Sequence, residues 1–170
     1  WDSARVAVKS IIEVALTLDK DASVEVVLWD GNEYGDLRCE KTEATCMQDI
    51  DKLFANNRPR ASTPLAKVLE DVYNTRLKEL FAKDEPSTVI ILTDGVPNEP
   101  QEVKNFFKHI VKESNLEQAG RETLAAFSFV QMGDDAGAED FLRDLDDNLI
   151  RETGISIDIA DTKKDDFLFG

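Results

Sequence analysis

The chain has 170 residues, of which 42% are hydrophobic and 32% charged, so it is long and apolar enough for one globular domain with a sizeable core. Its 20 Lys and Arg against 35 Asp and Glu give a net charge of −15, which disfavours binding to nucleic acid or to an anionic membrane surface. Its longest apolar runs have the length of a strand, well short of the roughly 20 residues that span a bilayer.

The first third of the chain predicts a helix, two strands and a second helix. Apolar spacings of three and four indicate an amphipathic helix over residues 3–18. Residues 24–29 form a nearly continuous β-branched run, typical of a buried strand, and residues 35–40 can form a short returning strand. The segment 45–48 matches the capping box and predicts a helix start. Cys39 and Cys46 are too few for a disulfide scaffold, and a short-loop disulfide between them stays open.

The remaining chain alternates helices and strands. Thr63 is expected to cap a long helix, with Pro64 at its first position. Further elements are expected as strand 88–93, helix 99–113, strand 124–130, helix 138–149 and strand 155–159. This alternation predicts a doubly wound α/β domain, with a mostly parallel sheet, residues 35–40 as the one antiparallel edge strand, and helices on both faces.

Two segments carry candidate chemistry at the carboxyl edge of the sheet, where ligands bind in such folds. The segment 62–65 places the Thr63 hydroxyl at a helix start, and 91–95 places the Asp94 carboxylate after a strand. Oxygen ligands of these two kinds suit Mg²⁺. Each residue also has an ordinary structural explanation, because Thr63 can be a simple N-cap and Asp94-Gly95 a simple turn.

In this order and alternation, the two segments resemble the von Willebrand factor A family, whose cation site at the sheet edge is the metal-ion-dependent adhesion site. The resemblance covers nearly all of residues 1–170, including the opening helix 1–8 and the segment 127–133 with the helix around 142–146. It implies a single domain in which Thr63 and Asp94 are metal ligands for Mg²⁺ or Mn²⁺. The rim of the binding face would include Ser62, Asn98 and Asp134.

The chain departs from the family at its first metal motif. No Asp-x-Ser-x-Ser is present, and Asp2 and Ser3 are interpreted as a helix cap because no strand precedes them. The resemblance therefore implies a domain truncated at its N-terminus, which lacks the strand between 24–29 and 88–93. Ser62 also replaces the family's glycine before the threonine, which narrows backbone freedom in the loop.

The function that the resemblance implies is a non-enzymatic module that captures an acidic side chain of a protein partner through the metal. Because the site is incomplete, weak or no metal binding is expected, and a cytoplasmic location is favoured. One alternative is an interaction domain whose metal site has decayed. Another is a Mg²⁺-dependent phosphohydrolase of the haloacid dehalogenase type, because residues 92–96 faintly resemble the nucleophile loop of that class. No nucleophile elbow or Gly-rich turn is present, and His109 is expected on the surface.

Overall fold

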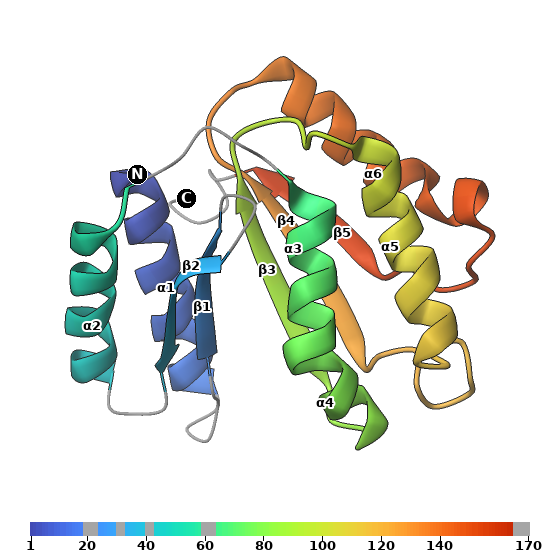
Figure 1. Cartoon of the computed structure of the whole chain (residues 1–170), viewed down its shortest axis with the longest axis horizontal. Coiled ribbons are helices and arrows are strands. Elements are labelled where there is room, and N and C mark those ends of the chain that lie inside the picture. Colours follow the sequence, from blue (N-terminus) through green and yellow to red (C-terminus); the bar gives the residue numbers. More distant parts are fainter. Residues whose placement is uncertain (19–23, 30–32, 40–42, 59–63, 165–170) are drawn as a thin grey trace. The chain divides into compact units, whose positions relative to one another are not determined.

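Figure 1 shows the computed structural model, which describes residues 1–18, 24–29, 33–39, 43–58 and 64–164. The structure is of mixed α/β class, as the alternation of helix and strand patterns predicts. It divides into two compact units, Trp1–Ser62 with Asp165–Gly170, and Thr63–Lys164. The two units are described separately.

The first unit pairs two helices with a β-hairpin. Its elements are α1 (Asp2–Leu18), β1 (Val24–Trp29), β2 (Glu33–Cys39) and α2 (Glu43–Asn56). β1 and β2 are antiparallel, with Val24 opposite Cys39, so the expected antiparallel strand is confirmed. The expected start of α2 at the capping box is wrong, because the helix begins at Glu43 and Thr45 lies inside its first turn.

The core of this unit lies between the two helices and β1. Its buried members are Ile12, Leu28, Cys46, Ile50 and Phe54. The Trp1 ring packs 4.8 Å from that of Phe54, and its indole N–H donates to the Phe54 carbonyl over 3.1 Å. The Cys46 side chain is buried in this core, at 2% exposed. Burial of a small thiol among apolar side chains makes it part of the packing.

The second unit is built on three parallel strands. Its elements are α3 (Leu65–Val72), the π-helical turn η1 (Tyr73–Leu77), α4 (Lys78–Ala82), β3 (Ser87–Thr93), α5 (Pro100–Glu113), β4 (Ala125–Gln131), α6 (Ala136–Thr153) and β5 (Ala160–Lys164). The strand order is β3-β4-β5, and both pairings are parallel. Parallel neighbours of this kind need the helical crossovers that α5 and α6 provide.

The last strand begins later than the sequence pattern suggests. Ile155, Ile157 and Ile159 are buried and alternate with exposed residues, so residues 155–159 have the side-chain period of a strand. The ladder to β4 nevertheless starts only where the Phe127 N–H donates to the Ile159 carbonyl over 2.9 Å. The predicted strand 155–159 is therefore wrong, and β5 is Ala160–Lys164.

The helical segment from Leu65 to Ala82 contains a π-helical turn that the apolar stripe does not reveal. The backbone stays helical through Tyr73 and Lys78, but η1 adds a residue to the turn. The fully buried Tyr73 ring meets Phe106 of α5 at a centroid distance of 6.5 Å. Its hydroxyl oxygen lies 2.7 Å from that of Ser114. The π-helical turn thus joins the α3–α4 segment to α5.

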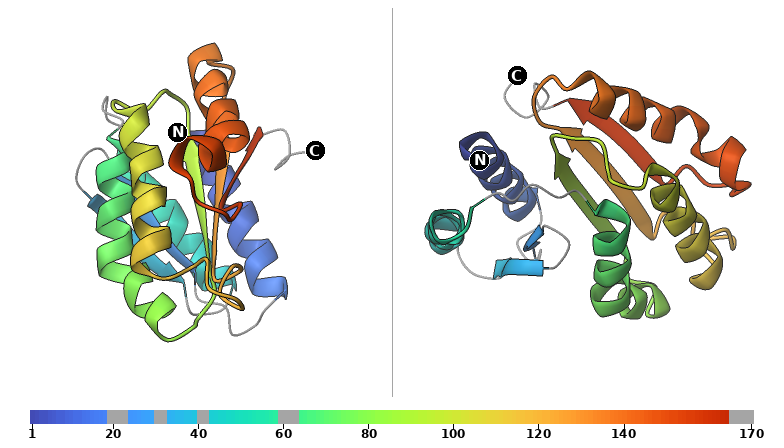
Figure 2. Two further views of the ribbon diagram at one scale, coloured as in Figure 1. Left: turned by 90° about the vertical axis from the view of Figure 1, so that its right-hand side faces the viewer. Right: turned by 45° about the horizontal axis from the view of Figure 1, so that its top comes forward.

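Helices α5 and α6 cover the same face of this sheet, as two views in Figure 2 illustrate. On β4, the Phe127 and Phe129 rings pack against Phe107 of α5, at 5.1 and 6.1 Å. Thr162 of β5 is the register partner of Phe129, and its N–H and hydroxyl donate to Asp146 of α6. The side chains of register partners in neighbouring strands point to the same face of the sheet, so α5 and α6 lie on one face. The side chains of Thr88, Ile90 and Ala126, on the other face, are exposed.

Lys104 links α5 to α6 through a buried ammonium group. Its side chain is only 6% exposed and donates to Asp144 and, over 2.5 Å, to Glu152. Burial lowers the pKa of Lys104, but the hydrogen bonds to the two carboxylates outweigh it, and the net direction is upward. A buried lysine is stable only with such partners, so this residue fixes how the two helices pack.

Replacement of Lys104 by alanine should destabilise the fold by about 2 kcal/mol, because it removes buried packing and leaves the Asp144 and Glu152 carboxylates facing each other. Lys108→Ala, at an exposed site on the same helix, should change stability by less than about 0.5 kcal/mol. Urea unfolding of both variants measures the difference. Equal stabilities would mean that the Lys104 link contributes nothing.

Acid should remove the contribution of the Lys104–Asp144 pair. Hydrogen bonds from Lys104 and then Asn148 hold the pKa of Asp144 below its ordinary 3.8. A lowered carboxyl pKa stabilises the folded state above the unfolded-state value and is lost as the pH falls through the folded-state value. The gap in unfolding free energy between wild type and Lys104→Ala should therefore narrow below about pH 3.8. A gap that widens in acid would contradict this assignment.

Candidate functional site

The candidate site lies at the carboxyl edge of the parallel sheet, where β3 and β4 end side by side. Thr93 and Gln131 are register partners, and both side chains are buried. The Met132 N–H donates to the Thr93 carbonyl over 2.8 Å, which extends the ladder one residue past β4. The turn after β3 and the turn after β4 therefore start at the same level of the sheet.

The turn after β3 carries the predicted ligand Asp94. The Thr93 hydroxyl donates to the Gly95 carbonyl over 3.3 Å, which folds the chain back directly after the strand. Asp94 and Asn98 are both exposed, while Pro97 between them is buried. The turn thus holds a carboxylate at the end of a rigid strand and open to solvent. This is the position that the sequence predicts for Asp94.

The turn after β4 carries Asp134, the predicted rim residue, and Asp135. Gly133 has a φ of +80°, a left-handed conformation that a side chain would strain. Asp135 is the N-cap of α6, and its carboxylate accepts from the Ala138 N–H over 2.7 Å. The Gln131 amide donates to the Asp135 carbonyl over 2.9 Å. Asp134 is exposed beside these fixed neighbours.

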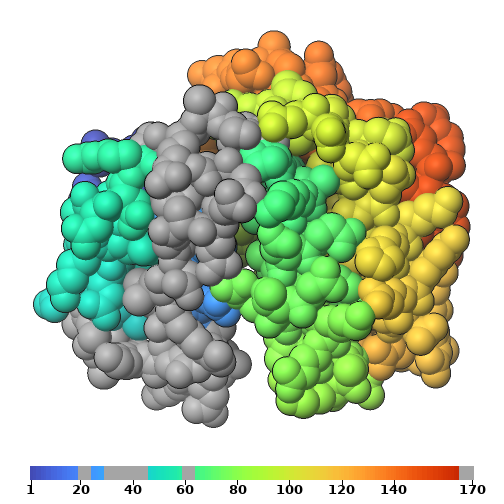
Figure 3. Space-filling view, in the orientation of Figure 1, coloured from blue at the N-terminus to red at the C-terminus, as the bar shows by residue number. Residues whose placement is uncertain are grey.

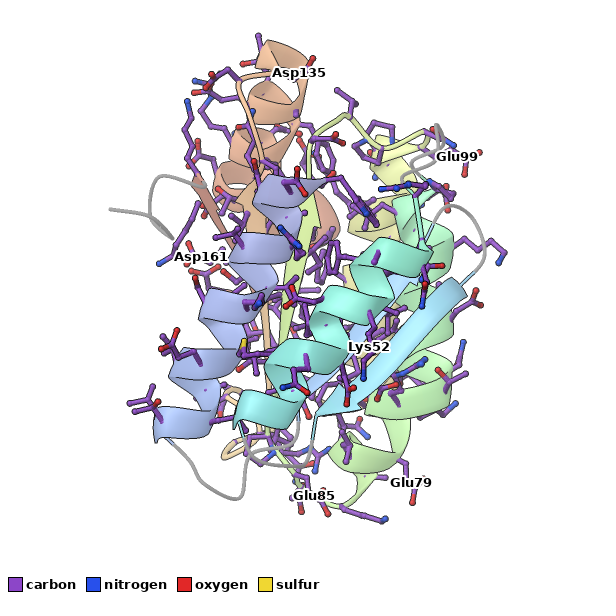
Figure 4. The ribbon with its side chains drawn as sticks, turned by 90° about the vertical axis from the view of Figure 1, so that its left-hand side faces the viewer. Lys52, Glu79, Glu85, Glu99, Asp135 and Asp161 are labelled. Atoms are coloured by element: carbon purple, nitrogen blue, oxygen red, sulfur yellow. The ribbon has the colours of Figure 1, made fainter. Side chains whose placement is uncertain are left out.

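A close approach between Val96 and Gly137 connects the two turns. A Cβ at Gly137 would come within 3.0 Å of the Val96 Cγ2 atom, so the absence of a side chain lets the first turn of α6 meet the β3 turn. Asp94, Asn98 and Asp134 accordingly lie on two adjoining turns at one edge. In Figure 4, Asp135 and Glu99 lie at this end of the unit, and Glu79 and Glu85 at the other.

The charge at this edge is negative. Asp94, Glu99, Asp134 and Asp135 are all exposed there. Lys164 donates to Glu139 of α6 over 2.9 Å, and this hydrogen bond lowers the pKa of the Glu139 carboxyl. The edge therefore attracts cations more readily than anions.

The described residues do not complete a metal site. They hold no group of three or more His, Cys, Asp or Glu side chains that could bind a metal ion. Ser62 and Thr63 lie outside the described residues, and Pro64, expected at the first helical position, is instead the N-cap of α3. Mg²⁺ and Mn²⁺ take six oxygen ligands in octahedral geometry, several of them commonly water, and of the predicted protein ligands only Asp94 lies in the described residues.

Away from this edge, a hollow of about 380 Å³ lies between α3 and α5, whose surfaces adjoin in Figure 3. His109 is on the surface there, as expected, with Nδ1 3.1 Å from Glu70 and Nε2 2.9 Å from Glu113. Lys78 donates to Glu113 over 2.6 Å and is the main cause of the lowered pKa of that carboxyl. His109 therefore lies within hydrogen-bonding distance of carboxylates on α3 and α5, and Lys78 of α4 shares Glu113 with it.

Sequence reasoning missed Asp135, Gln131 and the Val96–Gly137 contact. The helix was expected from residue 138, whereas α6 begins at Ala136. An Asp directly before a helix pattern is the signal that could have located the cap. The Gln131 hydrogen bond and the Gly137 contact carry no such signal, since both depend on how two turns meet.

Comparison with known proteins matched no family model, no curated protein and no solved structure. None of the helices in the described ranges combines the length and apolar character that crossing a membrane requires. The interpretation of this edge therefore rests on the residues and geometry given above.

Asp135 and Asp134 make a matched pair for testing the cap. Asp135→Ala should destabilise the fold by about 1 kcal/mol, because it leaves the Ala138 N–H without its acceptor. Asp134→Ala, at the exposed neighbouring position, should change stability by less than about 0.5 kcal/mol. Thermal unfolding followed by circular dichroism measures both changes. An equal loss in the two variants would show that charge at this turn, not the cap, sets the stability.

Proposed function

We propose that the chain is a protein-binding module of the von Willebrand factor A type, and that its binding face is the carboxyl edge of the parallel sheet. The observation that carries the proposal is the position of Asp94 at the end of β3, on a turn packed against the turn that bears Asp134. Loops at this edge are where open α/β sheets bind ligands. The proposed module is non-enzymatic, and it acts by binding a partner at this edge.

The finer architecture of the proposal is one doubly wound sheet. All five strands, β1 to β5, then belong to a single, mostly parallel sheet. In that sheet β2 is the antiparallel edge strand. The parallel order β3-β4-β5 and the antiparallel pairing of β1 with β2 support this arrangement. A single domain over residues 1–170 that lacks one further strand is part of the same proposal.

The partner in this proposal is a protein that presents a carboxylate. By the family resemblance, the group that would hold that carboxylate is Mg²⁺ or Mn²⁺, with Thr63 supplying a hydroxyl and Asp94 the anionic ligand. Ser62, Asn98 and Asp134 would border the contact. Because the described donors do not fit a complete cation site, the chain is expected to need further oxygen ligands before such a partner can bind.

Titration calorimetry with Mg²⁺ and Mn²⁺ tests the proposal. The chain alone should bind either ion weakly or not at all. The same chain extended upstream by a strand that ends in Asp-x-Ser-x-Ser should bind measurably, because the added carboxylate and hydroxyls complete the oxygen ligands. In the extended chain, Asp94→Ala should abolish this binding, whereas Asp158→Ala, at another exposed site, should leave it unchanged.

The other outcomes of this titration favour different functions. Equal ion affinity in the extended chain and in its Asp94→Ala variant would contradict the metal site and favour an interaction domain without one. Turnover of a phosphate ester with Mg²⁺ that is lost in Asp94→Ala would favour the phosphohydrolase. The nucleophile loop of that enzyme class carries two Asp residues two positions apart, and Thr93 and Leu92 occupy the places where the first would be sought.

A further inference from the structure

The only histidine of the chain, His109 of α5, lies between two carboxylates that belong to different helices. Its Nδ1 atom is 3.1 Å from Oε1 of Glu70 on α3, and its Nε2 atom is 2.9 Å from Oε2 of Glu113 on α5. A neutral imidazole ring carries one N–H, whereas a protonated ring carries an N–H on both nitrogens. Since an ionised carboxylate can only accept, both hydrogen bonds form together only when the His109 ring is protonated.

The two carboxylates differ in how firmly they are held. Glu113 lies one turn further along α5, and Lys78 of α4 donates to its other oxygen over 2.6 Å. That hydrogen bond is the main cause that holds the pKa of Glu113 below its ordinary 4.5, so Glu113 is ionised at neutral pH. Within the described ranges, Glu70 forms no other ion pair or side-chain hydrogen bond. A neutral His109 ring should therefore keep Glu113 and release Glu70.

A neighbouring contact between the same segments does not titrate near neutral pH. The hydroxyl oxygen of Tyr73, in the π-helical turn, lies 2.7 Å from that of Ser114 at the end of α5. Burial is the main cause of the raised pKa of Tyr73, so this hydroxyl stays neutral. The centroids of the Tyr73 and His109 rings are 6.0 Å apart. The Tyr73 contact with α5 therefore persists beside His109 whatever the charge on the imidazole ring.

Other titratable groups surround the ring without bonding to it. In addition to the four groups named above, those on the elements around it are Lys67 of α3 and, on or next to α5, Glu99, Glu102 and Lys112. Lys67 donates to Asp71 on its own helix over 3.0 Å. In the part of the chain that the structure describes, no hydrogen bond or ion pair joins Glu99, Glu102 or Lys112 to His109.

We propose that His109 forms a pH-dependent link between α3 and α5. The protonated ring holds Glu70 and Glu113 at once, whereas the neutral ring holds Glu113 alone. Glu70 and His109 both line the hollow of about 380 Å³ between the two helices, so the link closes one side of that hollow. Histidine is the side chain whose charge ordinarily changes between about pH 5 and pH 8. The link involves no metal and no residue of the proposed adhesion site.

The direction of the pH dependence follows from linkage. A side chain whose protonated form gains partners on folding stabilises the folded chain at low pH, and this contribution is lost as the pH rises. His109 gains two carboxylate partners in this way. The Glu70 contact should therefore stabilise the fold near pH 5.5 and contribute little near pH 8.

Urea unfolding at about pH 5.5 and about pH 8 tests the link with a double-mutant cycle. Glu70→Gln should raise the unfolding equilibrium constant by a factor about threefold larger at the lower pH than at the higher pH. In the His109→Gln background, the same substitution should have equal effects at the two pH values. Glu102→Gln is the matched control, because Glu102 lines the same hollow without bonding to His109, and its effect should not depend on pH.

An effect of Glu70→Gln that is equal at the two pH values, or larger at the higher one, would overturn the proposal. A pH-dependent effect that persists in the His109→Gln background would also overturn it, because another group would then be titrating. The replaced side chains are exposed or half-buried, so the variants should fold, and the unfolding curves show this directly. No measurement contains Mg²⁺ or Mn²⁺, so the adhesion-site proposal stands or fails separately.

Discussion

The parallel hydrogen-bond ladder between β3 and β4 is the constraint on which the rest of the second unit depends. It runs unbroken from the Ser87–Leu124 bond to the Met132–Thr93 bond. Because the register is fixed, Phe127 and Phe129 both face the α5 helix, and the two following turns start at the same level. The position of Asp94 beside the first turn of α6 is a direct consequence of this register.

The same ladder divides the unit into a closed side and an open side. Polar and aromatic contacts fix the closed side, where Lys104 joins α5 to α6 and Tyr73 joins the π-helical turn to α5. The open side consists of the outer edge of β3 and the face that bears Ile90.

Sequence reasoning located the elements whose signal is local. The β-branched run of β1 and the apolar stripe of α5 predicted those elements to within one residue. It misplaced β5. Residues 155–159 have the side-chain period of a strand, but the hydrogen bonds to β4 begin only at the Ile159 carbonyl. The π-helical turn was missed because it accompanies the tertiary contacts of Tyr73 with α5. The Asp135 cap was missed although an Asp directly before a helix pattern is its local signal. Of the candidate ligands, Asp94 lies where the pattern predicts, and Thr63 lies outside the described residues.

Amide hydrogen exchange along β3 tests the phase of its ladder to β4 most directly. Because the Ser87 N–H donates to the Leu124 carbonyl and the register is unbroken, the Val89 and Ile91 amides should donate to β4 and exchange slowly. Fast exchange at Val89 and Ile91 would contradict the register on which the positions of both turns depend.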